Sequence, residues 1–205
     1  MKNALGFLAV VALAACASRG EGTNPEDMSA AEHRRAAASE GDEARQHEAR
    51  YDPGVPGGDL PGSPGWLASG PRHLGQSAAH EAHARQHREA AEALERSEAA
   101  ECGSVPAASR AACPFEGRVT AMDELPDGVR LHLADPATVG ALVARARCHI
   151  AYSRTQGAHD VASCPLYAPG ADVRASADGT ALEITSSDAQ RVEEIKRRAR
   201  ERVQP

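Results

Sequence analysis

The sequence predicts an α+β protein, in which Ala- and His-rich helices precede a small domain built from two strand-strand-helix repeats. Residues 76–101 contain no Gly or Pro and consist mostly of residues that favour or tolerate helix. Beyond residue 101 the composition changes, and two Asp-Gly pairs between alternating segments predict β-hairpins. Neither repeat could bury a core alone, so we expect one four-stranded sheet covered by two helices.

The helical region extends over residues 30–101. A first helix is expected over residues 30–50, where Ser29 is a candidate N-cap and Glu32 stands at the spacing of a capping box. Residues 52–73 hold five prolines and many glycines, which predicts a linker before the second helix. The run Ala-Arg-Gln-His at residues 44–47 recurs at 84–87, which chance or local duplication explains as well as function does. We interpret the two helices as a hairpin or a loosely associated pair.

Residues 102–205 contain the clearer internal repeat. Each copy has a cysteine at a helix end, a Cys-Pro, a strand, an Asp-Gly turn, a second strand and a helix. After the turns, Leu131 and Leu133 correspond to Leu182 and Ile184, and their alternation is typical of a half-buried strand. The apolar stripes predicted for the two helices are Val139, Leu142, Val143, Ala146 and Ile150, and Val192, Ile195, Ala199 and Val203.

The first sixteen residues predict export. Residues 4–15 form an unbroken apolar run after Lys2. The run is too short to cross a bilayer core, which needs about 20 residues as helix, and it fits a signal peptide at residues 1–15. Leu13-Ala14-Ala15-Cys16 resembles the lipobox of bacterial lipoproteins. An ordinary secretory signal with a chance cysteine is the alternative.

The lipobox resemblance implies that Cys16 is acylated and becomes the first residue of the mature chain. More than one acyl chain gives stable anchoring, where a single chain would be marginal. Ala17, in place of a retention-type Asp, implies the outer membrane. Residues 16–29 are polar and hold Gly and Pro, so we expect a flexible tether.

Composition restricts the partners. The chain carries 29 acidic residues against 23 basic ones, and phosphate binding needs a basic surface. We therefore expect no nucleic-acid partner. Aromatic residues make up only 3% of the chain and most apolar residues are Ala, so the first half has little with which to build a core.

Four cysteines remain besides Cys16, and an even number in an exported protein predicts disulfides. The repeat favours the pairs Cys102–Cys113 and Cys148–Cys164, although sequence alone does not choose among the three connectivities. Loops this short would contribute about 3 kcal/mol each on the chain-entropy model. The alternative is a metal site, without a standard zinc spacing, formed by Cys148, His149, His159 and Cys164.

Histidines suggest a second possible metal site. His80, His83 and His87 fall on one face of the second helix, and imidazole is a common ligand for copper, zinc and nickel. His47 could join them if the first helix folds back. In the alternative interpretation these histidines line the packing seam or are solvated. We expect His149 to be structural and His132 to point away from the core, and the basic residues 196–202 to form a solvated helix face.

No nucleophile-and-base motif, phosphate-binding loop or thiol redox motif is present in the sequence, so we do not expect an enzyme. The leading hypothesis is a non-catalytic, lipid-anchored envelope protein that acts as an interaction or structural module. It would sit at the outer membrane, facing the periplasm, with an envelope protein as partner. The competing hypothesis is a periplasmic metal-binding lipoprotein, and an enzyme is the third. Apart from a possible transition metal, no cofactor is expected.

Overall fold

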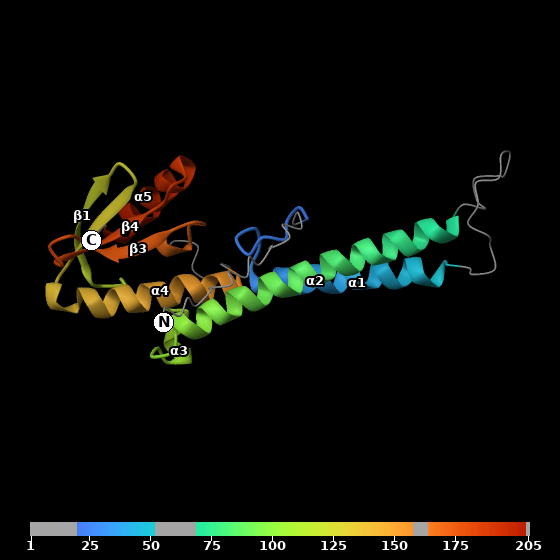
Figure 1. The fold of residues 1–205 in the computed structure, drawn as a ribbon. Helices are drawn as coiled ribbons and strands as arrows, with labels where there is room; N and C mark the ends of the chain where they lie inside the picture. The colour runs from blue at the N-terminus through green and yellow to red at the C-terminus, as the bar shows by residue number, and fades with distance from the viewer. Residues whose placement is uncertain (1–19, 52–68, 158–163, 204–205) are drawn as a thin grey trace, which may run out of the picture.

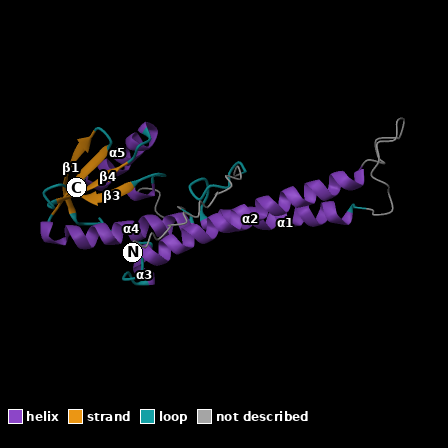
Figure 2. Ribbon diagram, in the orientation of Figure 1, coloured by secondary structure: helices purple, strands orange, loops and turns teal. Residues whose placement is uncertain are grey.

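The structure, a computed structural model, describes residues 20–51, 69–157 and 164–203. A long helical hairpin extends from a domain with a four-stranded sheet (Figure 1), and Figure 2 shows that the strands of the described residues all lie in that domain. The α+β prediction is therefore confirmed, with the helices first and the strands after them. The predicted signal peptide and the predicted lipidation site, Cys16, lie outside the described residues.

The hairpin consists of α1 (Ala30–Ala49) and α2 (Ser69–Glu101). Ser29 and Glu32 form the predicted capping box, because each side chain binds the backbone N–H of the other. The second helix begins at Ser69, so the linker prediction over 52–73 is wrong for its last five residues. Pro71 does not prevent this, because it lies in the first turn, where its missing N–H has no helical partner to lose.

The sheet contains β1 (Val119–Leu125), β2 (Gly128–Leu133), β3 (Asp172–Ala175) and β4 (Ala181–Thr185). Its order is β1-β2-β4-β3, and every neighbouring pair is antiparallel. Short helical turns lie in the connections: α3 (Ala107–Arg110), η1 (Pro136–Thr138) and η2 (Pro165–Tyr167).

Two helices cover one face of the sheet, and each covers mainly the strands of the other repeat. The helix α4 (Val139–Gln156) follows β1 and β2 but packs chiefly on β3, whereas α5 (Ala189–Val203) follows β3 and β4 but packs on β1 and β2. The predicted stripes face the core, with Val143 partly buried and the Val203 side chain not described. Because the helix of each repeat packs on the strands of the other repeat, neither repeat could bury a core alone.

The two repeats are related by an approximate twofold axis at the centre of the sheet. Leu131 pairs with Leu182, its own counterpart in the other repeat, and the flanking pairs follow in antiparallel order. Residues near such an axis lie close to their own counterparts.

Gly128 occupies the first position of β2, so the first turn is centred on Pro126 and Asp127, one residue earlier than the Asp-Gly prediction. A Cβ at Gly128 would collide with the carbonyl oxygen of Ile184 on the neighbouring strand. Glycine is required there by the close approach of two backbones.

Candidate functional site

Three buried or part-buried polar side-chain pairs cross the seam between α1 and α2. His33 Nδ1 lies 3.0 Å from His87 Nδ1, and His47 Nδ1 lies 3.1 Å from His73 Nδ1. Between these two pairs, His80 Nδ1 lies 2.6 Å from the Glu40 carboxylate. The participating residues recur every seven positions on each helix, which is the repeat of a coiled-coil seam. We call these pairs the histidine layers.

Small residues fill the seam between the histidine layers. The side chains of Ala37, Ala44, Ser77 and Ala84 are buried there. Small side chains let two helices approach closely, but they remove little apolar surface from water. The hairpin therefore has a weak hydrophobic core for its length, and its polar pairs matter correspondingly more.

The recurrence of Ala-Arg-Gln-His at residues 44–47 and 84–87 has a structural explanation. His33 and His47 correspond to His73 and His87 at the same offset of 40 residues that relates Glu40 to His80. In an antiparallel hairpin the first residue of one helix meets the last of the other, so the duplicated histidines form two matching outer layers. The seven-residue spacing is present in the sequence, but it predicts these layers only when the spacings of both helices are compared in an antiparallel arrangement.

The His33–His87 layer is the most enclosed. The exposed fractions of the two residues are 0% and 6%. His33 Nε2 lies 3.1 Å from the carbonyl oxygen of Asn24, and a carbonyl oxygen only accepts hydrogen bonds. The proton of neutral His33 is therefore on Nε2, and its Nδ1 presents a lone pair to His87. Burial lowers the pKa of His87, and the neighbouring His33 lowers it further.

The other two layers lie further from the sheet domain and are less enclosed. His47 stacks on His80 with ring centroids 5.4 Å apart, and it also contacts His73. Partial burial lowers the pKa of His47, and His73 and His80 lower it further. His80 Nε2 lies 3.5 Å from the Glu43 carboxylate, so two carboxylates surround this imidazole.

The structure assembles the predicted metal ligands only in part. His47 meets His80 as predicted, but His87 contacts His33, and the His83 side chain is 47% exposed beside Glu40. Within the described residues, no group of three or more His, Cys, Asp or Glu side chains could hold a metal ion. Sequence reasoning missed His33, His73 and Glu40, and metal binding itself stays a prediction.

Residues 20–28, which we call the leading segment, pack against the hairpin. The Gly20 N–H donates to Gln86 Oε1 at 2.9 Å, and Thr23 is only 1% exposed. Asn24 supplies the carbonyl that binds His33. The prediction of a flexible tether over 16–29 is therefore wrong for its described part, because these backbone groups are paired with the hairpin.

The disulfide prediction is corrected. Cys102 bonds to Cys148, so the predicted pairs Cys102–Cys113 and Cys148–Cys164 are wrong. The bond joins the end of α2 to the middle of α4. Cysteines at equivalent places in the two repeats meet each other, rather than closing a loop within one repeat, because the repeats pack around a common axis.

Cys113 and Cys164, also counterparts, are buried and unbonded, with their sulfur atoms 3.1 Å apart. The hydrogen bond from Cys164 lowers the pKa of Cys113 to about 7, whereas that bond and burial raise the pKa of Cys164. Cys148 is bonded to Cys102, so its thiolate is not available to the alternative metal site. His159, another member of that set, lies outside the described residues.

His149 is structural, as predicted. It is 1% exposed, donates from Nδ1 to the Arg110 carbonyl at 2.7 Å, and stacks on Tyr167. Burial lowers its pKa. The imidazole therefore joins the connection after α2 to α4 and to the short turn η2.

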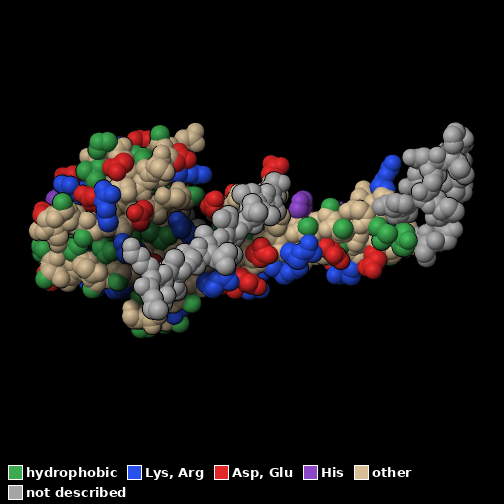
Figure 3. All heavy atoms as spheres, viewed as in Figure 1, with side chains coloured by type: hydrophobic (Ala, Val, Ile, Leu, Met, Phe, Trp, Pro, Cys, Tyr) green, Lys and Arg blue, Asp and Glu red, His purple; other side chains and the backbone are tan. Residues whose placement is uncertain are grey.

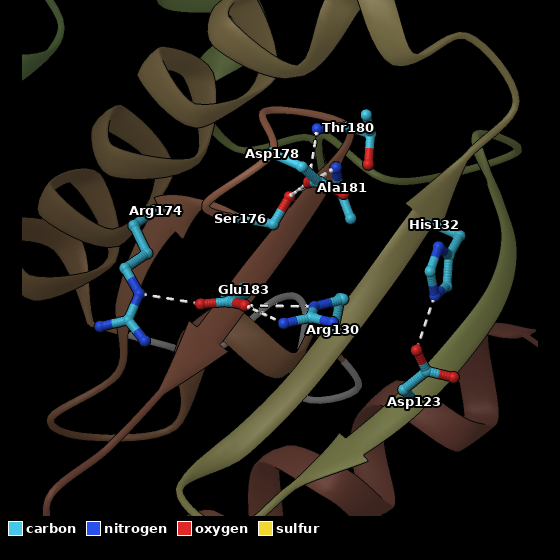
Figure 4. A network of polar contacts seen from close by, with 9 residues as sticks. All are labelled: Asp123, Arg130, His132, Arg174, Ser176, Asp178, Thr180, Ala181 and Glu183. Carbon is cyan, nitrogen blue, oxygen red and sulfur yellow. Dashed lines mark hydrogen bonds and ion pairs between the residues drawn. The ribbon is translucent and has the colours of Figure 1, made fainter.

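The uncovered face of the sheet carries a row of alternating charges (Figure 4). Asp123, Arg130, Glu183 and Arg174 stand in register across the four strands. Glu183, whose side chain is 8% exposed, accepts hydrogen bonds from both arginines, and these bonds lower its pKa. His132 lies on this face at 41% exposure and contacts Asp123, as expected for a residue off the core. The row has equal positive and negative charge.

The basic run on α5 is largely neutralised within the protein. Lys196 and Arg200 contact Glu124 of β1, while Arg197 and Arg198 pair with acidic residues of α5 itself. The solvated-face prediction is confirmed for Arg197 and Arg200, whose side chains are half exposed or more. It is wrong for Lys196 and Arg198, whose side chains are only 13% and 12% exposed, because their ion pairs hold them against the protein.

A cavity of about 350 Å³ lies where the hairpin meets the sheet domain. Its lining joins Met28 of the leading segment, Leu94 of α2, Ile150 of α4 and Tyr167 of η2. The lining also includes charged residues, namely Arg154, Glu26, Asp27 and Glu32. The cavity at the base of the hairpin therefore has mixed apolar and charged walls.

Comparisons with protein-family models, with curated proteins and with solved structures find no match to this chain. In the described part of the chain, no helix combines the length and the apolar character needed to cross a bilayer. Function must therefore be inferred from the chemistry of the chain itself.

Proposed function

We propose that this chain is a non-catalytic, lipid-anchored protein of the bacterial cell envelope. It is held at the outer membrane through acylated Cys16, faces the periplasm, and serves as an interaction or structural module for another envelope protein. The lipobox resemblance of residues 13–16 supports the anchor. The Cys102–Cys148 bond supports export, because disulfides persist in oxidising compartments.

The docking of the leading segment on the hairpin is the observation that carries this proposal. Only residues 17–19 separate Cys16 from Gly20, whose amide is bound to Gln86. Four residue steps span at most about 14 Å when fully extended. An anchor at Cys16 therefore holds the side of the hairpin close to the lipid surface, because no long flexible linker separates the two.

The hairpin offers a partner a charged surface rather than an apolar one. Acidic and basic side chains are mixed along it (Figure 3), and several pair with each other, as Arg34 does with Glu95. Mixed charges keep a surface soluble and favour a partner with complementary charges. A partner would then be recognised by its pattern of charge, at a fixed height above the membrane.

Cys16→Ser tests the anchor, and with it the proposed location. The parent should incorporate a fatty-acid label and sediment with outer-membrane fractions, while the variant should lose the label and become soluble after cell disruption. Cys113→Ser is the matched control, since it removes a cysteine outside the lipobox and should keep the label. A Cys16→Ser variant that retains both the label and membrane sedimentation would contradict the proposal.

A further inference from the structure

The two outer histidine layers have the geometry of metal-ligand pairs. Two imidazole nitrogens bound tetrahedrally to one zinc ion, each at about 2.0–2.1 Å, lie about 3.3 Å apart. The Nδ1 atoms of His33 and His87 are 3.0 Å apart, and those of His47 and His73 are 3.1 Å apart. Each pair therefore needs only a small displacement to hold one ion between its rings.

The tautomer of His33 suits this role. A metal-binding imidazole usually donates its other N–H to a carboxylate or a backbone carbonyl, which fixes the ring and directs the free nitrogen at the ion. His33 makes this arrangement, because its Nε2–H donates to the Asn24 carbonyl and its Nδ1 lone pair faces His87. Without metal, His87 donates its Nδ1–H to that lone pair. With metal, the His87 proton moves to Nε2.

Burial also favours this pair. An imidazole must be neutral to bind a metal, and burial lowers the pKa of His87, which lies against the fully buried His33. The Nδ1 atoms of His47 and His73 lie at a similar distance from each other in the outer layer at the other end of the hairpin, but this pair is more exposed. We therefore expect its affinity to be lower.

We propose that the hairpin binds divalent transition-metal ions between α1 and α2, one at His33–His87 and a weaker one at His47–His73, with solvent completing each coordination shell. Borderline ions such as zinc, nickel and copper suit imidazole ligands. This set differs from the one suggested by the helical spacing of α2, because the ligands pair across the hairpin rather than along one helix. The proposal holds whether or not the chain is lipid-anchored.

Metal bound at these pairs would stabilise the packing of α1 against α2, whose contact otherwise consists of small and polar side chains. An ion that binds only the folded hairpin stabilises it by mass action, and the gain grows with the concentration of free metal. The tip and the base of the hairpin would each hold one such cross-link, while the Glu40–His80 layer between them is already joined by the contact of the imidazole with the carboxylate.

Zinc chloride titrated into the mature chain tests the proposal by calorimetry and thermal melting. The parent should bind up to two ions per chain and melt at a higher temperature with zinc. His33→Gln with His87→Gln should remove the tighter site and weaken zinc binding at least about tenfold, the scale seen when a metal site loses its support. The control is His132→Gln, a histidine on the uncovered sheet face, which should bind as the parent does.

Ring-nitrogen NMR on the unsubstituted chain keeps the test valid if the double variant does not fold. Zinc should shift the Nδ1 resonances of His33 and His87 and leave the Nε2–H of His33 protonated. The unbonded thiols are common to parent and variants, so they do not create a difference between them. Zinc binding that is absent, that is unchanged in the double variant, or that leaves both Nδ1 resonances unmoved would overturn the proposal.

Discussion

Replacing Cys102 and Cys148 by alanine removes the covalent link between the end of the hairpin and α4. The bond spans 46 residues of sequence. On the chain-entropy model, closing a loop of this length contributes about 4 kcal/mol at 25 °C. The loss should appear as a lower midpoint in urea unfolding under non-oxidising, non-reducing conditions, followed by circular dichroism.

A reductant supplies the matched control for this double variant. It should lower the stability of the parent towards that of the variant and leave the variant unchanged, because the variant no longer has the bond. Peptide mapping of the unreduced parent should recover the Cys102 peptide joined to the Cys148 peptide. A stability loss below about 1 kcal/mol, where the model requires about 4, or a Cys102 peptide joined to Cys113 would refute the reasoning.

Three further predictions follow from the seam and the sheet. The pKa values of His47 and His87 are lowered in the folded chain, so the unfolded chain binds more protons at acidic pH. Their contribution to the stability of the hairpin is therefore complete above about pH 6.5 and decreases as the pH falls below that value. Helicity measured during a pH titration checks this, and a flat profile from about pH 7 to about pH 5 would contradict it. The pKa of Glu183 is also lowered, so its contribution to stability is complete above about pH 4.3 and declines as the pH falls below that value. Glu183→Gln should cost about 1 kcal/mol at pH 7, after allowance for the exposed arginines, and less at pH 2. Urea unfolding at both pH values measures this difference, and an equal cost at the two values would contradict it. Gly128→Ala should destabilise the sheet domain by roughly 1–3 kcal/mol through collision with the Ile184 carbonyl, and a melting temperature equal to that of the parent would contradict that contact.

Local signals in the sequence predicted much of the fold. The capping box at Ser29, the alternation at Leu131 and Leu133, and the apolar stripes of α4 and α5 each depend on residues close together in the chain. A helix start was displaced only where Pro71 fitted into the first turn of α2. These features are fixed by neighbouring residues, so a single sequence suffices to recognise them.

The errors concern relations between distant segments. The cysteine pairing required knowing that the two repeats pack around an axis, which brings counterparts together, whereas sequence proximity favoured pairs within a repeat. The leading segment looked like a tether because nothing in its composition reveals that Gly20 and Asn24 bind the hairpin. The histidines of α2 suggested ligands along one helix, while the antiparallel register pairs them with α1.

Photo-crosslinking from residue 21 to lipid tests the central claim most directly. Glu21 is exposed in the leading segment, a few residues beyond the proposed anchor. A photoreactive residue there should label membrane lipid in the parent and not in Cys16→Ser. Inserting a long Gly/Ser linker between Ala17 and Gly20 should reduce the labelling sharply while keeping the protein on the membrane. Labelling that is absent in the parent, or that is unaffected by the linker, would contradict a hairpin held against the lipid surface by a short anchor.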